Sequence, residues 1–176
     1  MNDGMVLQDK ILPTEQEQDM QIEGLIAPGA EDVQTIETLS YMMGESFMEE
    51  NWTRATLDAL GGNVSDERKL ELSRETMRLE FTYGTPYPAC YATPDLAACT
   101  GAYLKSDLNG VSWSAVEDEA HAQMARDFMT PEEAAAYSEA FKRLEPVSDF
   151  DWEADRAKET GYDDFIHFYV IGVDKN

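Results

Sequence analysis

The chain has 176 residues, of which 43% are apolar and 10% aromatic, so one folded domain with a substantial core is expected. Its 36 acidic residues against 13 basic ones give a formal net charge of −23, which repels nucleic-acid phosphates and anionic lipid surfaces. The charge therefore excludes nucleic-acid and anionic-membrane binding as expected functions, whereas a cationic partner or an amine substrate is compatible with it.

The sequence predicts a cytoplasmic protein. No apolar stretch reaches the roughly 18 residues of a transmembrane helix, and the N-terminal segment carries acids where a signal peptide needs bases. The two cysteines, Cys90 and Cys99, do not form the pattern of a disulfide framework.

The first half of the chain alternates between helical patterns and short breaks. Residues 1–20 are polar and predict a flexible arm, and residues 21–176 are expected to form the domain. Residues 20–28 predict a short first strand. Apolar residues at steps of three or four predict a helix over 30–47, which Gly44 ends or bends. Two more helices are expected over 50–62 and 65–81, the second with Ser65 as its N-cap.

The second half begins with a β-hairpin and ends with a strand. Two short apolar runs around Pro94 and Asp95 predict the hairpin. From 115 to 161 the pattern is helical, and Thr130, Pro131 and Glu133 form a helix start with a capping box. Residues 163–173 contain almost no polar residue, which predicts a central strand covered on both faces. The fold class is therefore α/β in the mixed α+β sense, with helices flanking a mixed sheet.

Three stretches of the chain resemble the GNAT superfamily of acetyl-CoA-dependent N-acetyltransferases. Residues 25–47 are similar to the first strand and helix of that family, although the Arg that it often carries near Ala27 or Pro28 is absent. Residues 88–107, with Gly101, are similar to the second and third strands, and residues 165–176 to the fourth. The resemblance covers most of residues 22–176 and rests on this succession, because no single motif is diagnostic.

The resemblance implies a mainly antiparallel sheet and acetyl-CoA as cosubstrate. The backbone of Ile171, Gly172 and Val173 would bind the pantetheine arm as an added strand does. The family's Gln/Arg-x-x-Gly-x-Gly/Ala loop, which binds the pyrophosphate, does not occur in these 176 residues. Three explanations are open: a fragment of a longer enzyme, a second chain that supplies the loop, or a shortened relative that does not catalyse.

Two residues of the last strand are catalytic candidates for transfer to a primary amine. His167 has the pKa range of a general base, although a buried histidine bonded to the backbone is the alternative. Tyr169 lies two residues further on, on the same face, and could orient a substrate or pack in the core.

The substrate-binding candidates are aromatic. Tyr83 and Tyr87 lie just before the hairpin and could line an acceptor pocket, with ordinary packing as the alternative. Phe47 and Trp52 fall in the region that shapes the acceptor site of the GNAT family.

The second histidine and the two cysteines are not expected to form a catalytic or metal site. His121 lies four residues after Glu117 in a stretch that is not an HExxH motif, so a surface histidine and no metal are expected. Cys90 and Cys99 have no nearby histidine or cation in the sequence and are expected as small core residues.

A second class of function stays open. The chain could be a non-catalytic binding or assembly module that uses its last strand to pair with a partner chain or with a second copy of itself. Because an unpaired strand edge is a template for further strands, the chain is expected to dimerise or aggregate unless that edge is covered.

Overall fold

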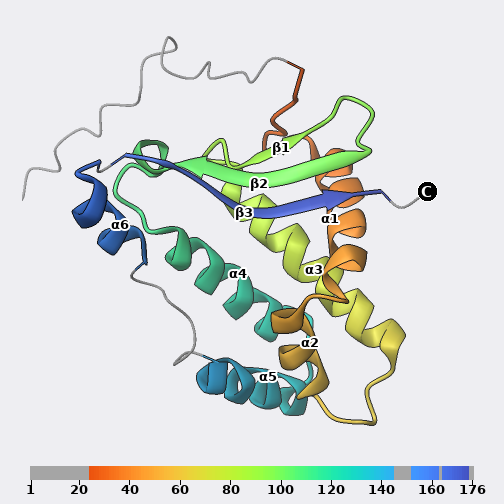
Figure 1. The fold of residues 1–176 in the computed structure, drawn as a ribbon. Coiled ribbons are helices and arrows are strands. Elements are labelled where there is room, and N and C mark those ends of the chain that lie inside the picture. The colour runs from red at the N-terminus through yellow and green to blue at the C-terminus, as the bar shows by residue number, and fades with distance from the viewer. Residues whose placement is uncertain (1–23, 145–151, 163, 175–176) are drawn as a thin grey trace, which may run out of the picture.

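The computed structural model describes residues 24–144, 152–162 and 164–174 (Figure 1). The elements in these ranges follow one another in this order: α1 (Val33–Phe47), α2 (Asn51–Asp58), α3 (Asp66–Gly84), β1 (Cys90–Ala92), β2 (Ala98–Leu104), the 3₁₀ helix η1 (Lys105–Leu108), α4 (Trp113–Asp127), α5 (Pro131–Leu144), α6 (Trp152–Thr160) and β3 (Ile166–Val173).

The three strands form an antiparallel sheet in the order β1-β2-β3, and helices lie along one face of it (Figure 1). The main core lies between this face and α1 and α3, where Leu39, Met43 and Phe81 are almost completely buried. The mixed α+β class with helices flanking a mainly antiparallel sheet is thus confirmed. No described helix is long and apolar enough to cross a lipid bilayer.

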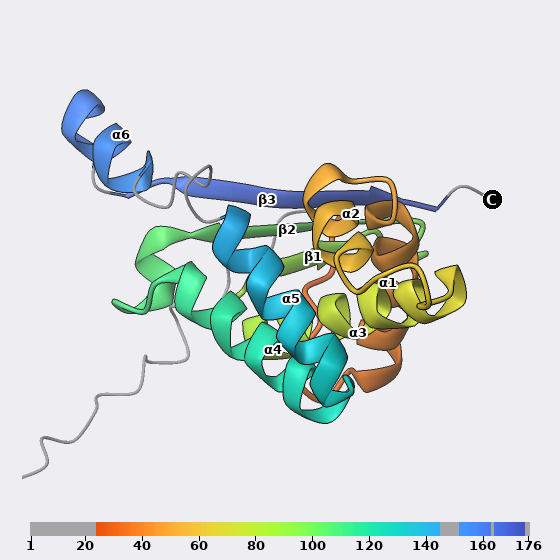
Figure 2. The ribbon, with the colours of Figure 1, turned by 90° about the horizontal axis from the view of Figure 1, so that it is seen from below.

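The prediction that the last strand is central is wrong. β3 pairs with β2 alone among the described strands and therefore lies at an edge of the sheet, as Figure 2 shows from the helical side. One face of β3 packs on the core, but the other leaves Ile166, Phe168, Ile171 and Val173 between 57% and 70% exposed. The nearly continuous apolar run therefore reflects an apolar outer face that no described element covers.

The first strand is reduced to a single bridge among the described residues. Ile26 and Ala92 exchange two backbone hydrogen bonds, with N···O distances of 2.8 and 2.9 Å, and pair as an antiparallel bridge. Residues 20–23 and the predicted arm over 1–20 lie outside the described residues.

The predicted helix starts are confirmed at atomic detail. The Ser65 hydroxyl accepts a hydrogen bond from the Arg68 amide at 3.2 Å, as an N-cap does. At the start of α5, the Thr130 amide donates to Glu133 Oε2 at 2.9 Å and the Glu133 amide donates to Thr130 Oγ1 at 3.2 Å, which is a complete capping box. Arg68 also donates to both oxygens of Glu133, so the same carboxylate fastens α5 to α3.

Gly44 lies inside α1 and does not end it. A Cβ at this position would lie 2.7 Å from the Arg74 Cα and 2.8 Å from its amide nitrogen, so only glycine allows α1 and α3 to approach this closely. The Ser73 hydroxyl donates to the Gly44 carbonyl at 2.9 Å across the contact. The expectation for Gly44 is therefore corrected: its small size fixes a helix crossing.

Candidate functional site

Polar residues of α3 and α4 face one another beneath β3. Each helix presents residues at the spacing i, i+3, i+4 and i+7, which places them on a single face. These two faces are lined by Ser73, Thr76, Met77 and Glu80 on α3, and by Ser114, Glu117, Asp118 and His121 on α4. Together with parts of α2, α5 and β3 they enclose a cavity of about 480 Å³, a size suited to a small organic molecule.

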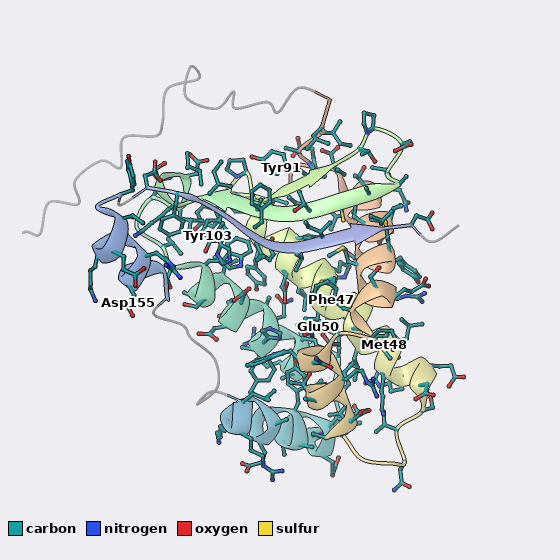
Figure 3. All side chains as sticks on the ribbon, viewed as in Figure 1. Phe47, Met48, Glu50, Tyr91, Tyr103 and Asp155 are labelled. Carbon is teal, nitrogen blue, oxygen red and sulfur yellow. The ribbon has the colours of Figure 1, made fainter. Side chains whose placement is uncertain are left out.

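The walls of the cavity are largely aromatic. Trp52 of α2 meets Phe141 of α5 edge to face, with ring centroids 5.7 Å apart. Phe141 also packs against Tyr137 and His121, at centroid distances of 4.9 and 4.8 Å. Phe47 lines the cavity where α1 ends and α2 begins, a junction that Figure 3 shows with Phe47 and Glu50 labelled.

Three polar side chains come together in the lining of the cavity. His121 Nδ1 lies 2.9 Å from the Tyr137 hydroxyl, within hydrogen-bonding distance. Its other nitrogen, Nε2, lies 3.6 Å from Glu80 Oε1, which is longer than a hydrogen bond. The Glu80 side chain is only 8% exposed, so this carboxyl group lines the cavity at its buried end.

Burial favours the neutral forms of both Glu80 and His121. It raises the pKa of the Glu80 carboxyl well above its ordinary value, and the nearby Glu117 carboxylate adds to the effect. Burial also lowers the pKa of His121 to about 4. At neutral pH the contact between them is therefore not an ion pair, and His121 is an uncharged imidazole that can accept a proton.

The other carboxylates of the cavity lie nearer its mouth or are already engaged. Glu50 accepts hydrogen bonds from the Trp52 and Thr53 amides at 2.9 and 2.7 Å and so caps α2. Glu117 accepts one from Trp113 Nε1 at 2.9 Å, and Asp118 is exposed. The lining residues that the structure describes include no Lys or Arg, so the cavity has a negative potential.

A β-bulge brings β3 to the edge of this cavity. Gly101 pairs with Val170 and Ala102 with Phe168, so that Tyr169 is an extra residue on β3. The Tyr169 ring lies against Gly101, where a Cβ would be 2.2 Å from its Cζ atom, and its hydroxyl donates to the Ala89 carbonyl at 3.2 Å. Tyr169 and Val170 both line the cavity.

The structure brings together some of the predicted site residues. Phe47, Trp52 and Tyr169 line the same cavity although they lie on α1, α2 and β3. His167 lies apart from it, with Nδ1 2.6 Å from the Tyr103 hydroxyl. Whether these residues act on a substrate stays a prediction.

The two tyrosines before the hairpin are not among the lining residues of the cavity. The Tyr83 hydroxyl donates to Gln123 Oε1 at 2.6 Å, between α3 and α4. Tyr87 packs against the small core around Tyr103 and Trp113. Both side chains are half-buried, and their substrate-binding role also stays a prediction.

The predicted cofactor-binding residues lie on β3 just beyond the bulge. Ile171 and Val173 are 70% and 58% exposed on the outer face, whereas Gly172 faces the core. A Cβ on Gly172 would lie 2.0 Å from Met43 Sδ, so close contact with α1 requires glycine here. Along an antiparallel edge strand every second residue turns its backbone N–H and C=O away from the neighbouring strand. The Asp174 amide donates to the Ala97 carbonyl, so Ile171 and Val173 are the residues whose backbone groups an extended ligand could reach.

Sequence reasoning missed Glu80 and Tyr137 and placed His121 on the surface. The expectation for His121 is wrong, because α5 and α3 cover it and leave 22% of its side chain exposed. The available signal was the matched polar spacing on two consecutive helices. That signal shows which residues share a face but not which two faces meet.

The remaining reactive residue types behave as packing residues. Cys90 and Cys99 are 7% and 4% exposed and not bonded to each other, and burial raises the pKa of each thiol to about 12. Their prediction as small core residues is confirmed. Among the described residues, no group of three or more His, Cys, Asp or Glu is arranged to hold a metal ion.

Comparison with known proteins adds no relative from which a function could be transferred. No family model matches the chain, and no curated protein and no solved structure matches it either.

Proposed function

We propose that this protein is an N-acetyltransferase-like protein of the GNAT type, which transfers an acetyl group from acetyl-CoA to a primary amine. The observation that carries the proposal is the bulged edge strand β3, whose extra residue Tyr169 lines the cavity while the following backbone lies at the sheet edge. This arrangement supports a pair of adjacent sites, one for an extended donor and one for a small acceptor.

The donor site would lie along β3 over Ile171, Gly172 and Val173, with the outward-facing backbone groups of Ile171 and Val173 as its hydrogen-bond partners. Pantetheine contains two amide groups and can pair with a strand edge as a peptide does. A thioester at the end of that arm would reach the bulge at Tyr169, which lines the cavity.

The acceptor site is the cavity itself. The amine nitrogen attacks the thioester carbonyl carbon, a C–N bond forms and the C–S bond breaks, with its electron pair leaving on the thiolate. The nitrogen loses one proton and the thiolate takes up a proton. The uncharged His121 imidazole lines the cavity and is one candidate base, although its lowered pKa makes it a weak one. His167, beside Tyr103 on the same strand as Tyr169, is the second candidate base.

The proposal includes a further segment that binds the pyrophosphate of the cofactor. The glycine-rich loop of the GNAT family does not occur in these 176 residues, so the segment would belong to a longer form of the chain or to a partner chain. S-acetylpantetheine, which has the thioester and the amide arm but no nucleotide, removes the need for that loop in an experiment.

The test is product formation measured by mass spectrometry. The chain is incubated with 2-phenylethylamine and either acetyl-CoA or a high concentration of S-acetylpantetheine, with heat-denatured protein as the control. The proposal predicts N-acetylated amine above the uncatalysed level with at least one donor. No product above the control with either donor would overturn it.

A second candidate function is a non-catalytic assembly module. It is favoured by the exposed apolar outer face of β3, because an edge strand with an apolar face suits pairing with another chain. Self-association or capture of a strand without any acetyl transfer would support this candidate over the enzyme.

A further inference from the structure

The cavity contains a buried carboxyl group, Glu80, that has no cationic partner among the residues the structure describes. Glu80 is 6% exposed, and its nearest titratable neighbour, His121, is uncharged at neutral pH and 3.6 Å away. A buried carboxyl without a charge partner or hydrogen bond costs free energy of folding, so its presence at the end of an open cavity needs an explanation.

The surroundings of Glu80 all favour a positive ligand. The titratable groups that line the same cavity are Glu50 at the start of α2, Glu117, Asp118 and His121 on α4, Tyr137 on α5 and Tyr169 on β3. None of these carries a positive charge at neutral pH. A cation is therefore attracted by the carboxylates of the lining. Among the described lining residues, Glu80 is the one acidic residue that is buried.

The walls of the cavity select the rest of the ligand. Trp52, Phe141 and Phe47 offer ring faces and edges to an apolar body, and an aromatic ring face also attracts a cation. The cavity volume of about 480 Å³ is at the small end of ligand sites and excludes a folded protein segment.

We propose that the cavity binds an organic cation, a primary ammonium group on an aromatic or branched apolar body, with Glu80 as the counter-ion. Its identification as the acceptor substrate rests on the proposed acetyl transfer, whereas the binding itself does not. Without a ligand, burial raises the pKa of the Glu80 carboxyl and favours its protonated form. Binding of an ammonium ion favours the carboxylate, so the carboxyl group releases a proton.

The experiment is isothermal titration calorimetry of the 176-residue chain with three probes of one shape: 2-phenylethylamine, 2-phenylethanol and phenylacetate. Titrations near neutral pH in two buffers of different ionisation enthalpy measure the protons released. We expect the amine to bind at least tenfold more tightly than the alcohol, the acid not to bind, and a fraction of a proton approaching one to be released per amine.

Three variants assign the effect to residues. Glu80→Gln keeps the size of the side chain and is expected to weaken amine binding at least tenfold and to abolish proton release. Glu119→Gln removes an exposed carboxylate elsewhere on α4 and is the matched charge control, with less than a twofold effect expected. Trp52→Leu reduces the aromatic wall and is expected to weaken amine and alcohol alike.

Each other outcome is decisive. Equal binding of amine and alcohol, unchanged amine binding in a folded Glu80→Gln variant, or no binding of any probe overturns the cation site. Amine binding with proton release but no N-acetylated product leaves the cation site standing and removes the acetyltransferase proposal. Acetyl transfer that does not depend on Glu80 leaves the acetyltransferase proposal standing and overturns the identification of the Glu80 site as the acceptor site.

Discussion

Glu80 of α3 and His121 of α4 face each other across one cavity, with Oε1 and Nε2 3.6 Å apart, and burial favours the neutral form of both. An acidic and a basic side chain at this distance would form an ion pair on the protein surface. Here neither gains enough from the other to offset its desolvation. Burying Glu80 and His121 therefore lowers the free energy of unfolding, and the effect of each residue can be measured from its pH dependence.

Replacing Glu80 by Gln should stabilise the protein at neutral and alkaline pH. The pKa of Glu80 is raised in the folded state, so the unfolded chain loses its proton first, and stability falls as the pH rises above the ordinary value of 4.5. The Glu80→Gln variant should therefore have a higher free energy of unfolding than the wild type at pH 8. The gain should disappear near pH 4. Urea unfolding at both values measures it, and an equal effect at both would contradict the assignment.

The wild-type protein should lose stability in acid because of His121, and the His121→Gln variant should lack this loss. The pKa of His121 is lowered from 6.5 to about 4 in the folded state, so the unfolded chain takes up a proton first as the pH falls. The contribution of His121 to the free energy of unfolding is constant above pH 6.5. It declines between pH 6.5 and pH 4, by about 3 kcal/mol in total. Unfolding curves across this window should differ in slope between wild type and His121→Gln. Parallel curves would show that His121 titrates normally.

Gly44→Ala should push α1 and α3 apart. The new Cβ would lie under 3 Å from backbone atoms of Arg74, which cannot move without the helix. Overpacking of this kind costs about 1–3 kcal/mol, more than alanine gains in helix propensity. Gly62→Ala, with no atom within 4 Å of its Cβ, is the control and should change the unfolding free energy little. Equal effects of the two substitutions would mean that the close crossing is not a constraint.

The outer face of β3 should make the protein self-associate. Phe168 and Ile171 are 60% and 70% exposed on an edge strand, so Phe168→Lys should place a charge on the pairing surface and lower the association constant at least tenfold. Val33→Lys on α1, a residue 59% exposed, is the matched control. Sedimentation equilibrium measures both. A wild-type chain that stays monomeric at high concentration would contradict this prediction.

The sequence predicted the elements well because their determinants are local. Ser65 and the Thr130–Glu133 capping box act within one helical turn, and the hairpin around Pro94 and Asp95 depends on a turn of a few residues. Such signals need no knowledge of tertiary structure.

The position of β3 and the composition of the cavity could not be predicted in the same way. An apolar strand has the same sequence pattern whether its outer face is covered or exposed, so the edge position of Ile166–Val173 depended on the tertiary arrangement. Glu80 and His121 are 41 positions apart in sequence and meet only because α3 and α4 pack with those faces inward. Phe47 and Trp52 line the same cavity because a short turn joins their helices, and their role in binding a substrate stays a prediction.

The proposed acetyl transfer requires that the donor binds along β3. NMR spectroscopy of the ¹⁵N-labelled chain tests this binding directly. Titration with S-acetylpantetheine requires no pyrophosphate loop and detects weak binding residue by residue. We expect saturable chemical-shift changes that are largest at the amides of Val170, Ile171, Gly172 and Val173. An absence of shifts in this segment at millimolar ligand, or shifts concentrated on another element, would contradict it.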